Sequence, residues 1–328
     1  MTNKQLLLTT ILTAFVGTSA IANDNSKLRG SVKIDGSSTV YPITEAVAEE
    51  FAEEAPRVRV TVGISGTGGG FKRFSAGEID ISDASRPIKA TEEKVCTEAG
   101  LEFIEVPVAY DGLTIVVNKE NDWCNALTVD QIKKMFLDGS TAKTWQDIDS
   151  SWPAMPLKLY SPGTDSGTFD YFKEVVAGKT GSIRSDMSVS EDDNVLVRGV
   201  AGDKGGIGFF GCAYFFENTD KLKAVAVHNG TANVMPNSES IESGEYAPFS
   251  RPLFIYVNKE ALAKPAVKIF VDYYIDNAGD MAEEVGYVRL PEDIYNRVRS
   301  NIATMKTGTQ FLDDEGEKVH GALAAVYK

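Results

Sequence analysis

The sequence is poor in histidine and cysteine, and this scarcity removes most catalytic and metal-binding chemistries. Among 328 residues there are two histidines, His228 and His320, and three cysteines. Neither histidine has a serine and a carboxylate close to it in the sequence, and the chain has no HExxH motif and no paired Cys/His zinc spacing. A GxxxxGK[ST] loop is absent as well. We therefore expect no metal, no cofactor and no nucleoside triphosphate site.

Positive charge is also in short supply. Lysine and arginine number 33 against 47 aspartates and glutamates, which gives a formal net charge of −14. Proteins that bind nucleic acid need a basic face, so nucleic acid is not an expected partner. If the ligand is an anion, local dipoles and hydrogen bonds must hold it, because the overall field of the protein repels it.

Long hydrophobic runs are missing outside the N-terminus. There, Lys4 precedes an apolar run from Leu6 to Val16, and Ala20-Ile-Ala22 fits a small-x-small cleavage site. This pattern predicts a signal peptide over residues 1–22 and an exported mature chain that begins near Asn23. The run is too short for a comfortable transmembrane helix.

Three cysteines are too few for a disulfide-dense scaffold but fit an oxidising compartment. Cys96 and Cys124 flank a predicted pair of strands, and we predict a disulfide bond between them. Cys212 lies in an apolar run and is predicted to be a buried free thiol. The sequence leaves the other pairings open.

Glycine and small hydroxyl residues, by contrast, are concentrated in three stretches: Gly36–Thr39, Ser65–Gly70 and Gly163–Thr168. Each leads into a predicted helix, whose first N–H groups and positive dipole end attract anions. Plain helix caps and turns are the alternative interpretation, but a cap needs one hydroxyl and these stretches hold several. The candidate anion-binding residues here are Ser38, Thr39, Ser65, Thr67, Ser166, Gly167 and Thr168.

Short strands alternate with helices, which is typical of an α/β fold with parallel sheets. One predicted helix covers Phe71 to Ala76. Residues 113–120 (LTIVVNKE) and 253–260 (LFIYVNKE) match at six of eight positions. This repeat is either a chance similarity of two buried strands or a pair of equivalent strands where the chain crosses between two similar lobes. The second interpretation predicts one lobe from residues 23–112 plus 251–328 and another from 113–250.

Few charged residues lie near the three loops. Arg86 could grip an oxyanion with its two-pronged guanidinium, or it could be a surface residue of a turn. Asp83 and Asp165 could accept a hydrogen bond from an anion that carries a proton, as monohydrogen phosphate does and sulfate does not.

A competing hypothesis is an exported serine hydrolase or phosphatase that uses Ser140 or Ser166. Ser140-Thr-Ala-Lys143 matches SxxK and Lys306-Thr-Gly308 matches KTG, a pattern of penicillin-recognising serine enzymes, but no SDN lies between them. The surroundings of Ser166 differ from the GxSxG nucleophile elbow. The SxxK and KTG matches are short and common, so they are weak evidence for a hydrolase.

Over most of its expected mature length the chain resembles the periplasmic phosphate-binding proteins of high-affinity phosphate ABC transporters. The resemblance is carried by four segments, residues 35–42 (DGSSTVYP), 66–71 (GTGGGF), 79–87 (IDISDASRP) and 162–169 (PGTDSGTF). It implies a type II periplasmic binding protein fold, with two lobes joined by two crossover strands around a ligand cleft. It also implies a periplasmic monomer, not an enzyme, that passes inorganic phosphate to the membrane permease of the transporter.

Two positions depart from the family pattern. Pro162 stands where well-known members have an arginine, and Ser85 stands where they have an acceptor aspartate. The resemblance therefore implies that Arg86 supplies the cation and that Asp165 or Asp83 accepts the phosphate proton. Sulfate or another tetrahedral oxyanion remains an alternative ligand.

Overall fold

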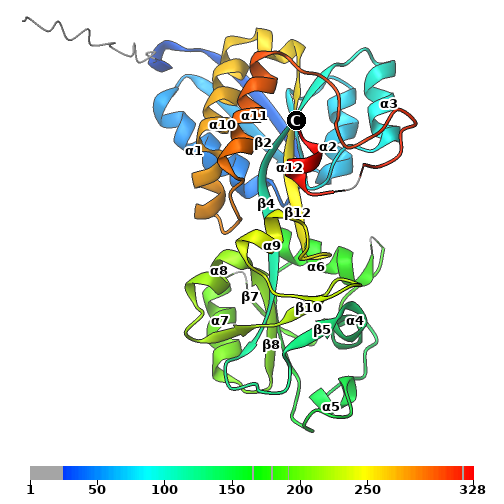
Figure 1. The fold of residues 1–328 in the computed structure, drawn as a ribbon. Coiled ribbons are helices and arrows are strands. Elements are labelled where there is room, and N and C mark those ends of the chain that lie inside the picture. The colour runs from blue at the N-terminus through cyan, green and yellow to red at the C-terminus, as the bar shows by residue number, and fades with distance from the viewer. Residues whose placement is uncertain (1–24, 165, 179, 191, 320) are drawn as a thin grey trace, which may run out of the picture.

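The computed structural model describes residues 25–164, 166–178, 180–190, 192–319 and 321–328. The expected signal peptide lies outside these residues. The described chain forms two α/β lobes, one above the other in Figure 1, and the strands β4 (Phe103–Asn118) and β12 (Ser250–Asn258) run from one lobe to the other. This is the type II periplasmic binding protein fold that the resemblance implied.

The upper lobe in Figure 1 takes its elements from both ends of the chain. They are β1 (Gly30–Gly36), α1 (Tyr41–Glu54), β2 (Val58–Ile64), α2 (Gly66–Ser75), β3 (Ile81–Ala84), α3 (Ala90–Glu98), α10 (Pro265–Glu284), α11 (Glu292–Ala303) and α12 (Leu323–Val326), with two 3-10 turns at Asn25–Lys27 and Glu260–Ala263.

The lower lobe is built from the middle of the chain. Its elements are β5 (Ala126–Thr128), α4 (Val129–Phe136), α5 (Trp145–Ile148), β6 (Lys158–Pro162), α6 (Gly167–Ala177), β7 (Ser188–Ser190), α7 (Asp193–Gly202), β8 (Gly206–Gly211), α8 (Cys212–Glu217), β9 (Leu222–Ala224), β10 (Ala226–His228), β11 (Asn233–Val234) and α9 (Ser238–Glu242).

One strand order passes through both lobes, β2-β1-β3-β12-β4-β8-β6-β7, with β9 beside β4. The strand β4 pairs with β12 as far as Gly112 and with β8 from Leu113 onward. Leu253 opens the corresponding part of β12, which pairs with β4 and then also with β3 of the upper lobe. Each copy of the sequence repeat therefore begins near a crossing point. At Leu113 the strand β4 enters the lower lobe, and at Leu253 the strand β12 enters the upper lobe.

Aromatic side chains hold each lobe together. In the upper lobe, Phe51 on the buried face of α1 meets Phe270 of α10 edge to face at 5.2 Å between ring centroids. In the lower lobe, the rings of Phe172 (α6) and Phe209 (β8) stack 3.7 Å apart. Such contacts add to the hydrophobic stabilisation of burying large rings. The packing of Phe172 also fixes the direction in which α6 presents its opposite face.

The helix predicted to begin at Phe71 begins at Gly66 instead, so the glycine-rich stretch forms the first turn of α2. A helix interior disfavours glycine, but here α2 must lie close to β1. A Cβ atom at Gly70 would stand 2.7 Å from Cα of Gly36. The absence of side chains at Gly36 and Gly70 thus lets the first two loops pack directly against each other.

The predicted disulfide bond is wrong, because all three cysteines are free thiols. Cys96 lies in α3 of the upper lobe, whereas Cys124 lies in the segment between β4 and β5 of the lower lobe. The long strand β4 runs from one lobe to the other between them, and the predicted lobe boundary at residue 113 already put these two cysteines in different lobes. Cys212 is buried and free, as predicted, and its Sγ accepts a hydrogen bond from Thr114 Oγ1 at 2.9 Å.

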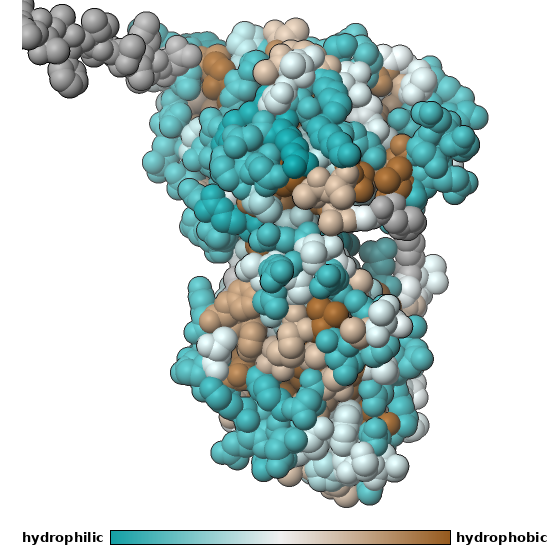
Figure 2. Space-filling model, in the orientation of Figure 1, coloured by the Kyte–Doolittle hydropathy of each residue, from teal (hydrophilic) through white to brown (hydrophobic). Residues whose placement is uncertain are grey.

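Hydrophilic side chains cover most of the molecular face seen in Figure 2. The molecule is narrower between the two lobes than across either of them (Figure 2). Within the part of the chain that the structure describes, no helix has the length and apolar character needed to cross a bilayer.

Candidate functional site

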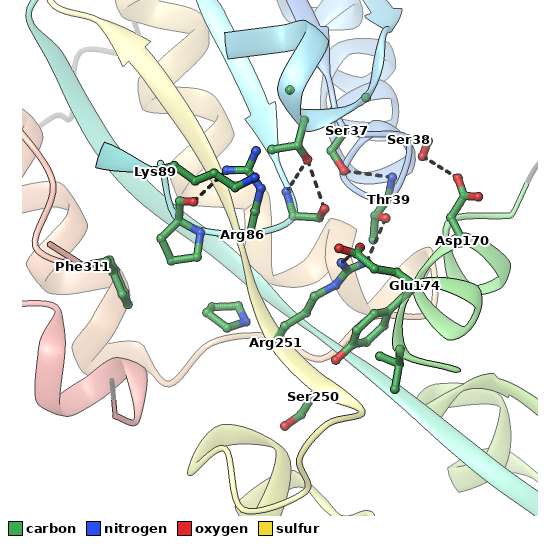
Figure 3. A pocket seen from close by; sticks show the side chains of 18 of the residues that line it. Ser37, Ser38, Thr39, Arg86, Lys89, Asp170, Glu174, Ser250, Arg251 and Phe311 are labelled. Atoms are coloured by element: carbon green, nitrogen blue, oxygen red, sulfur yellow. Dashed lines mark hydrogen bonds and ion pairs between the residues drawn. The ribbon is translucent and has the colours of Figure 1, made fainter. Parts of the chain in front are cut away.

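A cleft of about 850 Å³ lies between the lobes. The upper lobe contributes the loop after β1, the first turn of α2, the segment between β3 and α3, and the C-terminal segment. The lower lobe contributes one face of α6, and the crossover strand β12 contributes Ser250, Arg251 and Pro252 (Figure 3). Ligands of open α/β sheets bind in this position, beyond the carboxyl ends of the strands.

The first loop is fastened to the ends of the neighbouring strands. The N–H of Ser37 donates to the carbonyl of Asp83 at 3.0 Å, and the N–H of Ser65 donates to the carbonyl of Gly36 at 3.1 Å. The hydroxyl of Ser37 accepts a hydrogen bond from the N–H of Thr39 at 3.2 Å. Ser38 and Thr39 consequently face the cleft from a loop with little freedom to move.

The second loop contributes Thr67 to the cleft, and Ser65 lies outside the lining. Ser65 is the exposed residue that precedes α2, and its side chain makes no capping bond. Thr67 Oγ1 lies 3.1 Å from Ser85 Oγ and accepts the N–H of Ser85 at 3.2 Å. The structure therefore brings Ser38, Thr39 and Thr67 together at one wall.

The third loop stands at the beginning of α6, behind the cleft lining. Ser166 caps the helix by accepting the N–H of Thr168 at 3.2 Å, and Gly167 is the first helical residue. Ser166 and Thr168 are half-buried, and neither lines the cleft. Asp165 lies outside the described residues. The part of α6 that reaches the cleft is its next turns, with Asp170, Tyr171 and Glu174 among the lining residues.

Arg86 lines the cleft, but its guanidinium is engaged by a neighbour. Nη1 and Nη2 donate to the two carboxylate oxygens of Glu92, each at 2.8 Å, and Nη1 also donates to the carbonyl of Pro87 at 3.1 Å. Burial raises the pKa of Glu92, but the hydrogen bonds from Arg86 and from the Lys89 N–H outweigh it, so this pKa is lowered overall. The role of Arg86 as the cation for the ligand stays a prediction.

Arg251 is a candidate site residue that the sequence reasoning missed. Its Nε donates to Asp111 Oδ2 at 3.2 Å, its Nη2 donates to Thr39 Oγ1 at 3.2 Å, and its guanidinium lies 3.7 Å from the centre of the Tyr171 ring. The side chain is 15% exposed and faces the cleft (Figure 3). A cation so anchored is a preorganised partner for an oxyanion.

The sequence repeat held the signal that identifies this pair. Asp111 and Arg251 each lie two residues before the leucine that opens a copy of the repeat. They face one another as register partners between β4 and β12. The two strands are similar and otherwise apolar, and they carry opposite charges at equivalent positions. This pattern indicates an ion pair at the point where the strands meet.

Asp83, one of the two expected proton acceptors, is fully buried and does not line the cleft. Burial raises the pKa of its carboxyl to about 8, and the nearby charge of Asp35 acts in the same direction. Its backbone holds the first loop, as described above, but no described geometry brings its side chain to a ligand. Its assignment as the acceptor stays a prediction.

The raised pKa of Asp83 predicts a dependence of stability on pH. An aspartate in an unfolded chain titrates at about pH 4. Between about pH 4 and pH 8 the folded state keeps a proton that the unfolded state has lost, so the free energy of unfolding falls as pH rises through this range. In Asp83→Asn the decline should be shallower, with the remaining slope due in part to Glu105, whose pKa burial raises to about 7.

Urea unfolding of both proteins at several pH values measures these slopes. Parallel curves for the wild type and Asp83→Asn would show that the Asp83 carboxyl titrates normally.

The residues of the alternative hydrolase do not converge. Ser140 lies at a separate pocket near the end of α4, and its Oγ donates to the backbone carbonyl of Lys134 at 2.6 Å. Lys306 of the KTG match follows α11 in the upper lobe, where its Nζ lies 3.3 Å from Gln310 Oε1. The SxxK and KTG matches thus belong to different lobes and form no common site.

Two lobes joined by paired strands, with hydroxyl groups and an anchored arginine in the cleft, are typical of solute-binding proteins. A family model described as a PBP superfamily domain matches residues 22–278. The SphX protein of Synechococcus elongatus is 51% identical over 289 residues, which cover 87% of this chain and 85% of SphX.

The phosphate-binding protein PstS of Staphylococcus saprophyticus is 41% identical over 281 residues, which cover 85% of this chain and 86% of PstS. A solved structure of a "possible phosphate binding protein" from Planctomyces limnophilus is 44% identical with a TM-score of 0.82, covering 85% of this chain and 99% of that chain. The chain belongs to the PBP superfamily and, within it, to the family of phosphate-binding proteins.

Proposed function

We propose that this protein binds inorganic phosphate in the cleft between its lobes and passes it to the membrane permease of a phosphate ABC transporter. The observation that carries the proposal is Arg251, a largely buried cation that faces a wall of hydroxyl groups in an otherwise acidic protein. The names of the relatives support phosphate as the ligand.

Phosphate is held by short-range groups from both lobes. The guanidinium of Arg251 supplies the charge-assisted hydrogen bonds, and Arg86 adds positive potential from the rim. Hydroxyl and N–H groups of the three loops bind the remaining oxygens, and Asp165 accepts the proton of monohydrogen phosphate. The loop residues in this set are Ser38, Thr39, Ser65, Thr67, Ser166, Gly167 and Thr168.

Closure of the lobes completes the site. Residues 23–112 with 251–328 act as one body and residues 113–250 as the other, and the change of partner in β4 after Gly112 supports this division. Rotation about the crossover strands brings the N-terminus of α6, with its positive dipole end, onto the ligand. Binding contacts that exist only in the closed form shift the population toward it.

The protein acts without covalent chemistry, as an exported monomer whose signal peptide is cleaved near Asn23. Its low histidine content and the separation of the hydrolase motifs support a binding role. The transporter recognises the closed, loaded form.

Isothermal titration calorimetry of residues 23–328 with phosphate, arsenate and sulfate tests the proposal. We expect saturable binding of phosphate with one site per chain, much weaker binding of sulfate, and no turnover of a chromogenic phosphate ester. Failure to bind phosphate, or hydrolysis of the ester, would refute it.

A further inference from the structure

Two carboxylates of α6 reach across the cleft to groups that the proposed function assigns to phosphate. Asp170 Oδ2 accepts a hydrogen bond from Ser38 Oγ at 3.3 Å. Glu174 Oε2 lies 3.8 Å from Arg251 Nη1. Figure 3 shows both acidic side chains directed from α6 toward the first loop and Arg251. The cleft thus pairs its donors with carboxylates of the protein.

The placement of these two acids is not explained by the helix itself. They are four residues apart on α6, and like charges at this spacing repel each other and weaken a helix. Asp170 lies in the first turn and gains from the helix dipole, but Glu174 lies farther along, where this gain has faded. The side chain of Glu174 is 48% exposed, so water solvates much of its carboxylate.

A phosphate dianion bound to Ser38 and Arg251 meets these carboxylates as like charges. The hydroxyl of Ser38 has a single proton to donate, so donating it to phosphate requires Asp170 to give it up. Arg251 keeps its bond to buried Asp111 and exchanges only its outer partner, Glu174. When phosphate binds, it therefore replaces the carboxylates of Asp170 and Glu174 as the partner of Ser38 and Arg251.

Resting on the proposed function, we propose that Asp170 and Glu174 are internal counter-ions of the cleft's donors, and that they set the affinity of the cleft by competing with phosphate. They do not contact the bound ligand as acceptors. Because Ser38 belongs to the upper lobe and α6 to the lower, the same contacts link the two lobes across the cleft.

The test is calorimetry with phosphate and sulfate on Asp170→Asn, Glu174→Gln and the double variant, at low and at physiological ionic strength. Each single variant should bind phosphate about three- to tenfold more tightly than the wild type at low ionic strength, and less so when salt screens the charges. Sulfate binding should tighten as well. Glu217→Gln is the matched control, since it removes the same charge from an exposed residue of the lower lobe outside the cleft.

Affinities equal to that of Glu217→Gln would overturn the inference. So would weaker phosphate binding with unchanged sulfate binding in Asp170→Asn, which would make Asp170 an acceptor of the phosphate proton. A wild-type protein that does not bind phosphate refutes the proposed function instead, so the two failures are distinguishable. Thermal melts confirm that each variant is folded before titration.

Discussion

Replacing Arg251 by alanine should weaken phosphate binding by about 30-fold or more. The variant loses charge-assisted hydrogen bonds in a largely buried site, and truncating one partner of such a pair costs about 2–5 kcal/mol, a factor of roughly 30 to several thousand. Arg251→Lys should lose about tenfold, because lysine keeps the charge but not the two-pronged geometry. Calorimetry with phosphate measures both losses.

The alanine variant has a second defect that must be separated from the first. It leaves Asp111, which is 1% exposed, without its charged partner, and an unpaired buried charge destabilises a fold. The double variant Arg251→Ala with Asp111→Asn removes that charge and should recover much of the stability but none of the affinity. Phosphate binding within threefold of the wild type in the folded double variant would rule out Arg251 as the ligand's cation.

Replacing Gly36 by alanine should destabilise the protein by about 3 kcal/mol or more, on the scale of a strained backbone combined with a steric clash. Gly36 has φ of +147°, a conformation that residues with a Cβ atom rarely adopt. A Cβ atom there would also stand 2.8 Å from the backbone nitrogen of Asp83 and would collide with the Asp83 carbonyl, which binds the N–H of Ser37. The first loop would have to move away from β3, so phosphate binding should be lost as well.

Gly68→Ala is the control for this variant. It lies in the same glycine-rich region, in the first turns of α2, and a Cβ atom there meets nothing within 4 Å. Alanine is the better helix former, so the variant should unfold at equal or slightly higher urea concentration. A loss of stability in Gly36→Ala no larger than the change in Gly68→Ala would contradict the steric argument.

Much of the fold was predictable because its signals are local. The β-branched run Val58–Ile64 forms the strand β2, and α6 ends before Gly178, because β-branched runs and glycine stops act over a few residues. The repeat at residues 113–120 and 253–260 also pointed to the two strands, β4 and β12, that run between the lobes.

The errors concern contacts between residues far apart in the chain. The disulfide prediction treated Cys96 and Cys124 as neighbours, and it failed because the strand between them leaves one lobe and enters the other. Arg251 was missed because its partners, Asp111, Thr39 and Tyr171, come from three distant segments. Loop composition indicated where an anion could bind, but only the fold brings Arg251 into the same cleft.

The three unbridged cysteines make the protein a convenient host for a fluorescent reporter. Burial raises the pKa of Cys96 to about 11 and those of Cys124 and Cys212 to about 12, so the native thiols offer almost no reactive thiolate at neutral pH. A single cysteine introduced at an exposed position on the rim of the cleft would then be the one site that a maleimide dye labels. The fluorescence of that dye would test the proposed closure of the lobes on phosphate, and no native cysteine would have to be removed first.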